Sequence, residues 1–169
     1  MIKLFTVFAP ILLMLACSNK AENEPSDLPR LKKQLTEELK AITETYSNDN
    51  HGFIYTLFQN DTAQLQVVHP SYIPELKTSM EFGLAIALAF DETFPGEHER
   101  HEQFKKSTHF SKFTAYEWEG IPCYGIDMKT DIEATIILLE DLAMELYAFN
   151  EFTPFSTDFY DQGPLLKND

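Results

Sequence analysis

The chain has 169 residues, an apolar content of 44% and a formal net charge of −14. This length leaves room for one domain with a hydrophobic core, so we expect one domain and not two. The excess of acidic side chains repels phosphate backbones and argues against a nucleic-acid partner. It is typical of a soluble surface, and it also suits attraction to a basic protein partner.

The first predicted element is a short apolar segment that ends at a cysteine. Lys3 precedes the apolar run, residues 14–17 read Met, Leu, Ala and Cys, and a polar stretch begins at Ser18. A basic start, a short apolar run and a small residue before the cleavage point are typical of a secretory signal. The run is shorter than the roughly 20 apolar residues that span a bilayer. Residues 1–17 resemble the signal of bacterial lipoproteins, although Met14 stands where that signal usually has leucine.

The resemblance implies that residues 1–16 are removed and that Cys17 is lipidated and becomes the new N-terminus. Loss of Lys3 would change the formal net charge from −14 to −15. The resemblance also implies a place in the bacterial cell envelope, anchored to the lipid bilayer through Cys17. Ser18 is compatible with the outer membrane, facing the periplasm. An ordinary signal peptide or a membrane-tethered start, with Cys17 there by chance, is the alternative.

Beyond the signal, the sequence predicts a tether followed by one folded domain. Residues 17–27 are expected to be the lipidated cysteine and a flexible tether, because the residues after Cys17 include no large apolar side chain. Residues 28–169 are expected to form a single α+β domain. Apolar residues three and four positions apart predict a helix over residues 28–46 that packs on the core.

The next segments predict a hairpin and a buried helix. Residues 52–59 and 62–69 are β-prone runs, and Asn60 and Asp61 between them tolerate the positive φ that a two-residue hairpin loop demands. Residues 80–90 are apolar almost throughout, which predicts a central buried helix.

The second half of the chain predicts a similar order of elements. A charged stretch at residues 97–106 indicates a short exposed helix. Strands are expected over residues 111–118 and 121–128, with Glu119 and Gly120 at the turn, and a long helix over residues 131–149. The second cysteine, Cys123, is expected to be a small buried hydrophobe.

These elements combine into a predicted architecture. The two long helices at 80–90 and 131–149 open alike, and both openings fit a capping box with threonine, Thr78 or Thr130, as the N-cap. We therefore predict one antiparallel sheet of about four strands, built from two hairpins, with the two long helices on one face. The recurrence of helix, hairpin and helix raises the hypothesis of a repeated αββα unit.

One local cluster has the density of a metal site. On a helix, His98 and His101 share a face, and Glu102 stands four residues from His98, so imidazole and carboxylate groups could meet at zinc or a similar ion. The alternative is a solvated charged face in which Lys105 and Lys106 offset the carboxylates. No nucleophile elbow and no glycine-rich phosphate loop occurs in the sequence, so no catalytic residue and no cofactor is predicted.

Aromatic residues gather in two places that suit partner binding. The C-terminal segment, residues 151–169, is too aromatic for a disordered tail and too rich in proline for a long helix, so we expect a strap that folds back over the sheet or the helices. Aromatic side chains among acidic ones also suit a binding hot spot with a charged rim. The candidate partner-binding residues are Tyr116, Trp118, Phe152, Phe155, Phe159 and Tyr160.

The sequence thus favours an envelope-anchored lipoprotein with a non-enzymatic protein-binding domain. Its specific form is an inhibitor or immunity protein that blocks a basic enzyme or toxin. One alternative is a metal-binding protein or hydrolase that uses His98, His101 and Glu102. Another is an accessory subunit of an envelope assembly.

Overall fold

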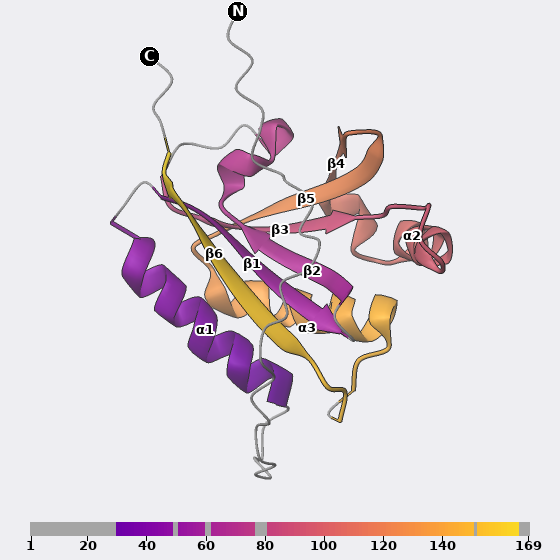
Figure 1. The fold of residues 1–169 in the computed structure, drawn as a ribbon, viewed down its shortest axis with the longest axis horizontal. Coiled ribbons are helices and arrows are strands. Elements are labelled where there is room, and N and C mark those ends of the chain that lie inside the picture. The colour runs from indigo at the N-terminus through magenta and orange to yellow at the C-terminus, as the bar shows by residue number, and fades with distance from the viewer. Residues whose placement is uncertain (1–29, 49–50, 60–61, 77–80, 151, 166–169) are drawn as a thin grey trace, which may run out of the picture.

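The structure is a computed structural model that describes residues 30–48, 51–59, 62–76, 81–150 and 152–165. The predicted signal and tether, residues 1–27, and the Thr78 cap lie outside the described residues. Within the described part of the chain, the fold is α+β, with a six-stranded antiparallel sheet and three α-helices (Figure 1).

The sheet has the strand order β4-β5-β3-β2-β1-β6, and every neighbouring pair is antiparallel. The strands are β1 (His51–Gln59), β2 (Thr62–Val68), β3 (Leu84–Ala89), β4 (Thr114–Trp118), β5 (Ile121–Lys129) and β6 (Ser156–Pro164). The helices are α1 (Arg30–Tyr46), α2 (Glu97–Lys106) and α3 (Ile132–Tyr147). Three single turns of 3₁₀ helix also occur, η1 (Pro70–Tyr72), η2 (Pro74–Leu76) and η3 (Phe110–Lys112).

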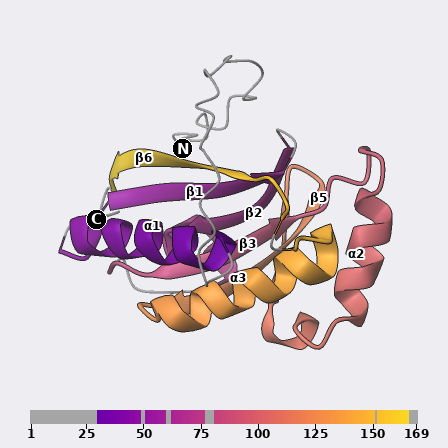
Figure 2. The ribbon, with the colours of Figure 1, turned by 90° about the horizontal axis from the view of Figure 1, so that it is seen from below.

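One face of the sheet carries the main hydrophobic core. Helices α1 and α3 lie side by side against this face, and α2 lies at the end of the sheet near β3 and β5 (Figure 2). The buried stripe of α1, which includes Leu35 and Leu39, packs into the same core as Leu139 and Leu142 of α3. Burial of such side chains is the main favourable term in folding.

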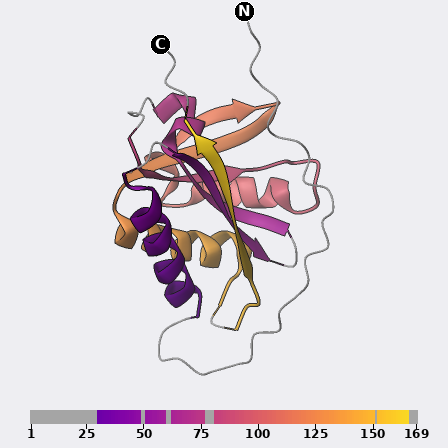
Figure 3. The same cartoon turned by 60° about the vertical axis from the view of Figure 1, so that its left-hand side comes forward.

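The opposite face is covered by a shorter segment. The turns η1 and η2 lie on this side (Figure 3), and Ile73 between them packs in a small cluster with Ile54, Val68, Ala85 and Ala87. Ile73 sits directly over the strand backbone at Gly125, where an added Cβ would lie 2.7 Å from the Ile73 Cδ1 atom. The absence of a side chain at Gly125 therefore lets this cover approach the sheet closely.

The structure confirms most of the predicted elements. The first helix, both hairpins, the short helix and the last helix lie where the sequence predicts them. The prediction for residues 80–90 is wrong, because residues 84–89 form strand β3 in the middle of the sheet. Both faces of β3 are covered, and a strand buried on both faces is as continuously apolar as a buried helix.

Three further predictions about the architecture need correction. The sheet has six strands and not about four, because β3 and the C-terminal β6 join the two hairpins. Two long helices do cover one face, but they are α1 and α3. Since the first hairpin leads into β3, helix, hairpin and helix follow one another only once among the described elements, so the repeated αββα unit is not confirmed.

The last helix also begins one residue later than its predicted capping box implies. Asp131, and not Thr130, is the N-cap, and its Oδ1 atom accepts a hydrogen bond from the Ala134 amide at 2.9 Å. Aspartate is as good an N-cap as serine or threonine, so the change of cap keeps the helix start satisfied.

Candidate functional site

The loop between β3 and α2 meets the tip of the β4–β5 hairpin and encloses an open hollow of about 370 Å³. Phe90 fixes the two parts together, because its amide donates a hydrogen bond to the Pro122 carbonyl at 3.0 Å. The hollow is lined by Phe90, Asp91, Glu92, Thr93, Gly120, Ile121 and Pro122. We call residues 91–96 and 117–121 the acidic-aromatic surface.

The hairpin tip owes its shape to two residues with positive φ. Glu119 has φ 51° and Gly120 has φ 85°, and two successive residues of this kind make the turn that matches the twist of a two-residue hairpin. Trp118 and Ile121 form the last cross-strand pair before this turn. The sequence Glu-Gly therefore places an aromatic residue and an acidic residue at the rim of the hollow.

The acidic-aromatic surface combines exposed aromatic rings with carboxylates. Phe94 is 63% exposed and Trp118 is 36% exposed, and both are among the five exposed large apolar side chains of the described residues. Glu92, Glu117 and Glu119 are exposed beside them. Large apolar side chains with an acidic rim are typical of a surface that binds a protein.

A chain of hydrogen bonds anchors the loop of this surface to the core. The Glu92 carboxylate contacts His101 Nδ1 at 2.7 Å, and His101 Nε2 contacts the Tyr124 hydroxyl at 2.7 Å. Because an ionised carboxylate only accepts, His101 donates from Nδ1 to Glu92, which leaves Nε2 for the hydrogen bond with the Tyr124 hydroxyl. His101 is buried and stacks on Phe90, with ring centroids 4.8 Å apart. These contacts connect the loop, through His101, to strand β5.

Glu92 also contacts His98 on the outer side of α2. Its second oxygen lies 3.0 Å from His98 Nδ1. Hydrogen bonds from His101 and His98 lower the pKa of Glu92, and the Glu92 carboxylate raises the pKa of His98. One carboxylate thus joins both histidines of the cluster that the sequence singles out.

The structure gives this cluster a different arrangement from the predicted metal site. His98 and His101 do converge, but on Glu92, while Glu102 pairs with Lys105 at 2.9 Å. Across the described ranges, no group of three or more His, Cys, Asp or Glu side chains is arranged to hold a metal ion. The residues predicted as ligands do not fit a metal ion in this arrangement.

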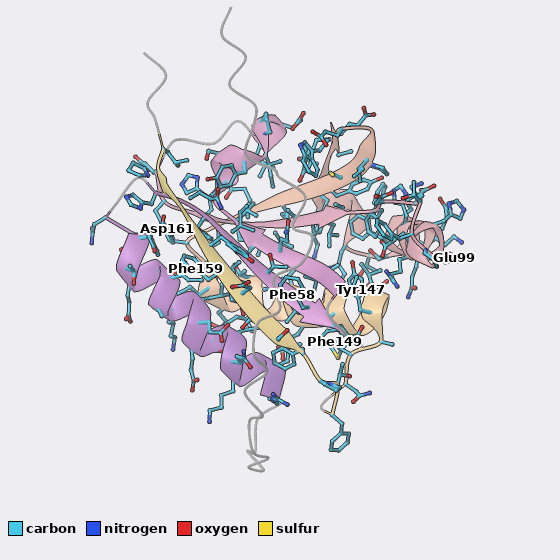
Figure 4. The ribbon with its side chains drawn as sticks, viewed as in Figure 1. Phe58, Glu99, Tyr147, Phe149, Phe159 and Asp161 are labelled. Atoms are coloured by element: carbon cyan, nitrogen blue, oxygen red, sulfur yellow. The ribbon has the colours of Figure 1, made fainter. Side chains whose placement is uncertain are left out.

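The six predicted partner-binding aromatics do not form one surface. Trp118 is at the tip of the hairpin on one edge of the sheet, whereas β6 forms the opposite edge. Figure 4 shows Phe159 and Asp161 along β6 on one side of the molecule and Glu99 on α2 on the other. Only Trp118 belongs to the acidic-aromatic surface.

The other five aromatics have separate structural places. Phe155 and Phe159 pack against the main core, and the Arg30 guanidinium lies 5.4 Å from the centre of the Phe155 ring. Tyr116 and Tyr160 pack against the opposite face, where burial raises the pKa of Tyr116. Phe152 is 84% exposed in the segment before β6. The expected strap is thus an edge strand, with its aromatics alternating between the two faces.

A second hollow, of about 390 Å³, lies between α1 and β6. Its polar groups are already paired with one another. The Tyr55 hydroxyl donates to Glu38 at 2.6 Å, and the Gln34 amide donates to both Glu38 and Thr157. These bonds explain how α1 is fixed to β6, so we assign this hollow a structural role.

Phe94 and Glu92 are the important residues that the sequence analysis missed. Their segment, Asp-Glu-Thr-Phe-Pro-Gly, follows an apolar run and contains the turn signal Pro-Gly. An aromatic residue inside a polar turn cannot reach the core easily, and this was the available signal. The convergence of Glu92 with His98 and His101 depends on how the loop folds back.

No helix in the described part of the chain is long and apolar enough to cross a membrane. Comparison of the chain with protein-family models, with curated proteins and with solved structures finds no match.

Proposed function

We propose that this protein is a lipoprotein of the bacterial cell envelope whose domain binds a basic protein partner without catalysis. The acidic-aromatic surface is the observation that carries this proposal. Its specific form is inhibition of, or immunity to, a basic enzyme or toxin.

The chemistry of the acidic-aromatic surface supports a protein partner over a small ligand. Rigid aromatic side chains such as Phe94 and Trp118 supply most of the binding energy at protein interfaces, with charged groups at the rim. The hollow beside them is open to solvent, whereas sites for small molecules bury most of their ligand. A partner side chain can enter the hollow while the rest of the partner covers the rim.

The charge of the surface supports a basic partner. Glu117 and Glu119 are exposed at the hairpin tip, and the whole chain has a formal net charge of −14. Opposite net charges accelerate encounter, and added salt screens this attraction within about 10 Å at 0.1 M. Binding that weakens as salt rises is therefore part of the proposal.

The hydrogen bonds of Glu92 support tight binding by preorganisation. A loop that is already ordered loses less conformational entropy when it binds. Each oxygen of the Glu92 carboxylate contacts one histidine of α2, His98 or His101, and these two contacts hold the loop against the helix. The surface therefore presents Phe94 and the hairpin tip in a fixed relation.

Capture of a partner by matched variants tests the proposed binding surface. The chain from Ser18 onward contains every described element, and it is immobilised as wild type, as Phe94→Ala with Trp118→Ala, and as Phe152→Ala. We expect one stoichiometric basic protein from envelope and culture extracts to bind wild type and Phe152→Ala at low salt. The double variant should lose it. Equal capture by all three chains would contradict the proposed surface.

The salt dependence of the same capture separates two functions. A basic partner released at high salt supports the inhibitor or immunity function. A partner that remains bound at high salt and co-purifies at a fixed ratio would instead indicate an accessory subunit of an envelope assembly.

The lipid anchor is tested independently of the partner. We expect the full chain to incorporate a palmitate analogue in bacteria and to sediment with membranes. Cys17→Ser should lose both properties, whereas Cys123→Ser should retain them. Labelling that persists in Cys17→Ser would contradict the proposed lipidation site.

A further inference from the structure

The sheet has two edge strands, β4 and β6, and they differ in whether their outward backbone groups are blocked. An edge strand presents backbone N–H and C=O groups that can pair with a strand of another chain, and proteins often block these groups. Which edge is blocked and which is open therefore indicates where a partner strand can add.

The β6 edge is closed by its own aspartates. The Phe159 amide donates to Asp158 Oδ1 at 2.9 Å, and the Gly163 amide donates to Asp161 Oδ1 at 2.7 Å. Gly163 has φ 78° at an irregularity of the β1–β6 pairing, and Pro164 ends the strand. Carboxylates on the strand amides, a bulge and a proline are all devices that prevent pairing with another strand.

The direction of the backbone groups in β4 follows from Pro122. Its carbonyl accepts from the Phe90 amide and so points toward β3. Backbone groups of successive residues in a strand point to opposite sides, so Cys123 points toward β4. Cys123 pairs with Tyr116, which leaves Ala115 and Glu117 with their N–H and C=O groups directed out of the sheet. The β4 edge therefore offers two residues for strand pairing, and no strand of the described residues lies beyond it.

The charges along this edge select the occupant. Glu117 and Glu119 are exposed at the end of β4, and Glu75 of η2 interacts electrostatically with Tyr116 of the same strand. A second copy of this chain would bring a formal net charge of −14 against an equal charge, and this repulsion disfavours pairing between copies. Lysine or arginine side chains of a basic segment would instead lie across from Glu117.

We propose that an extended basic segment of the partner adds to the sheet as a strand beside β4. This inference rests on the proposed function, because it specifies how the basic partner would be held. Backbone hydrogen bonds to Ala115 and Glu117 provide the pairing, and the acidic side chains select a basic sequence. The added strand would end beside Trp118, next to the hollow.

Backbone amide signals of the ¹⁵N-labelled chain from Ser18 onward test this proposal directly. The probe is a synthetic heptapeptide in which lysine and valine alternate. We expect saturable shifts and slower hydrogen exchange at the Ala115 and Glu117 amides, with no change at Phe159 or Gly163, and weaker binding at high salt. Saturable changes centred on β6, or no saturable binding, would overturn the proposal. Self-association of the chain through Ala115 and Glu117 in the absence of peptide would contradict the proposal that a basic segment occupies this edge.

A matched pair of variants isolates the backbone hydrogen bond. Glu117→Pro and Glu117→Ser both remove the carboxylate, but only proline removes the outward N–H. This N–H makes no hydrogen bond to β5, so the fold should tolerate proline at position 117. Thermal unfolding of the variant checks that it is folded. We expect Glu117→Pro to bind the peptide about tenfold more weakly than Glu117→Ser. Equal affinities of two folded variants would overturn the proposal, and Ala115→Pro against Ala115→Ser repeats the comparison should Glu117→Pro fail to fold.

The two proposals fail in distinguishable ways. If wild type captures a partner that is lost in the Phe94→Ala and Trp118→Ala variant, but Glu117→Pro captures it as well as Glu117→Ser does, the proposed function stands and strand addition is wrong. If the heptapeptide binds β4 but no protein is captured, the edge accepts a strand and the proposed function is wrong.

Discussion

At the residue scale, Glu92 is the side chain that connects the loop between β3 and α2 to the core. It contacts His98 and His101 through separate oxygens, and His101 also forms a hydrogen bond with Tyr124 on β5. A single carboxylate therefore joins a surface loop, a helix and a strand. Its neighbours are titratable, so this connection responds to pH.

The first prediction is a pH effect at His98. Its pKa is raised above the ordinary 6.5 by the Glu92 carboxylate, so the pair stabilises the fold fully below pH 6.5 and progressively less as the pH rises through the raised value. Glu92, with its lowered pKa, stabilises the fold above its ordinary 4.5 and loses this effect as the pH falls through the lowered value. The combined contribution is thus largest between about pH 4.5 and 6.5.

A titration of the His98 ring by NMR checks this effect. Glu92→Gln should return the pKa of His98 toward its ordinary value, because it removes the first cause of the shift. Glu99→Gln is the matched control, since Glu99 makes the last of the named contributions, and it should change the His98 pKa less. An unchanged pKa in Glu92→Gln would show that the pair does not form in solution.

The second prediction concerns the hairpin turn at Gly120. Its φ of 85° lies in a region that L residues with a Cβ adopt at a cost of about 1–2 kcal/mol, and no atom lies within 4 Å of an added Cβ. Gly120→Ala should therefore lower the free energy of unfolding by about 1 kcal/mol through backbone strain alone. Urea unfolding measures the loss, and Gly120→Asn should lose less because asparagine tolerates positive φ. An Ala variant as stable as wild type would argue against this turn.

At the element scale, the cover formed by η1 and η2 depends on contact between Ile73 and the β5 backbone. An added Cβ at Gly125 would lie 2.7 Å from Cδ1 and 2.9 Å from Cγ2 of Ile73, and Ile73 is fully enclosed. Gly125→Ala should destabilise the protein by about 1–3 kcal/mol, as overpacking does.

A double-mutant cycle identifies this contact as the cause. Ile73→Val removes the Cδ1 atom, so Gly125→Ala should cost less in the Ile73→Val background than in wild type. Urea unfolding of the four chains gives the coupling. Additive losses would mean that the destabilisation of Gly125→Ala has another origin.

Some secondary-structure elements could be predicted from local sequence signals alone, and others could not. The α1 stripe, the strands of both hairpins and the Glu119-Gly120 turn each depend on neighbours within a few residues, so their patterns predict them well. Strand β3 was misread because its run, Leu-Ala-Ile-Ala-Leu-Ala, is apolar throughout. Leu84, Ile86 and Leu88 face the helices, whereas Ala85 and Ala87 face η1 and η2. Large and small apolar residues alternate along this run, which indicates a strand whose two faces pack against different layers.

At the scale of the whole molecule, the excess negative charge opposes compaction. A net charge of −14 on this chain gives self-repulsion, which salt screens. Salt also weakens the exposed ion pairs, but these contribute little to stability. We expect the thermal unfolding midpoint to rise between about 0.05 M and 0.5 M sodium chloride. A variant with Glu99, Glu117 and Glu119 changed to glutamine should show a smaller rise, and a midpoint that falls with salt in wild type would contradict the argument.

The charge, the α+β class, most of the helices and both hairpins could be read from the sequence, because they follow from composition and from contacts between near neighbours. The tertiary structure alone decided that residues 84–89 form a central strand and that residues 156–164 close the opposite edge of the sheet. It also decided that Glu92 meets His98 and His101 and that the predicted aromatics separate onto different faces. Each of these outcomes depends on which segments far apart in the sequence pack against each other, and a local sequence pattern does not specify those segments.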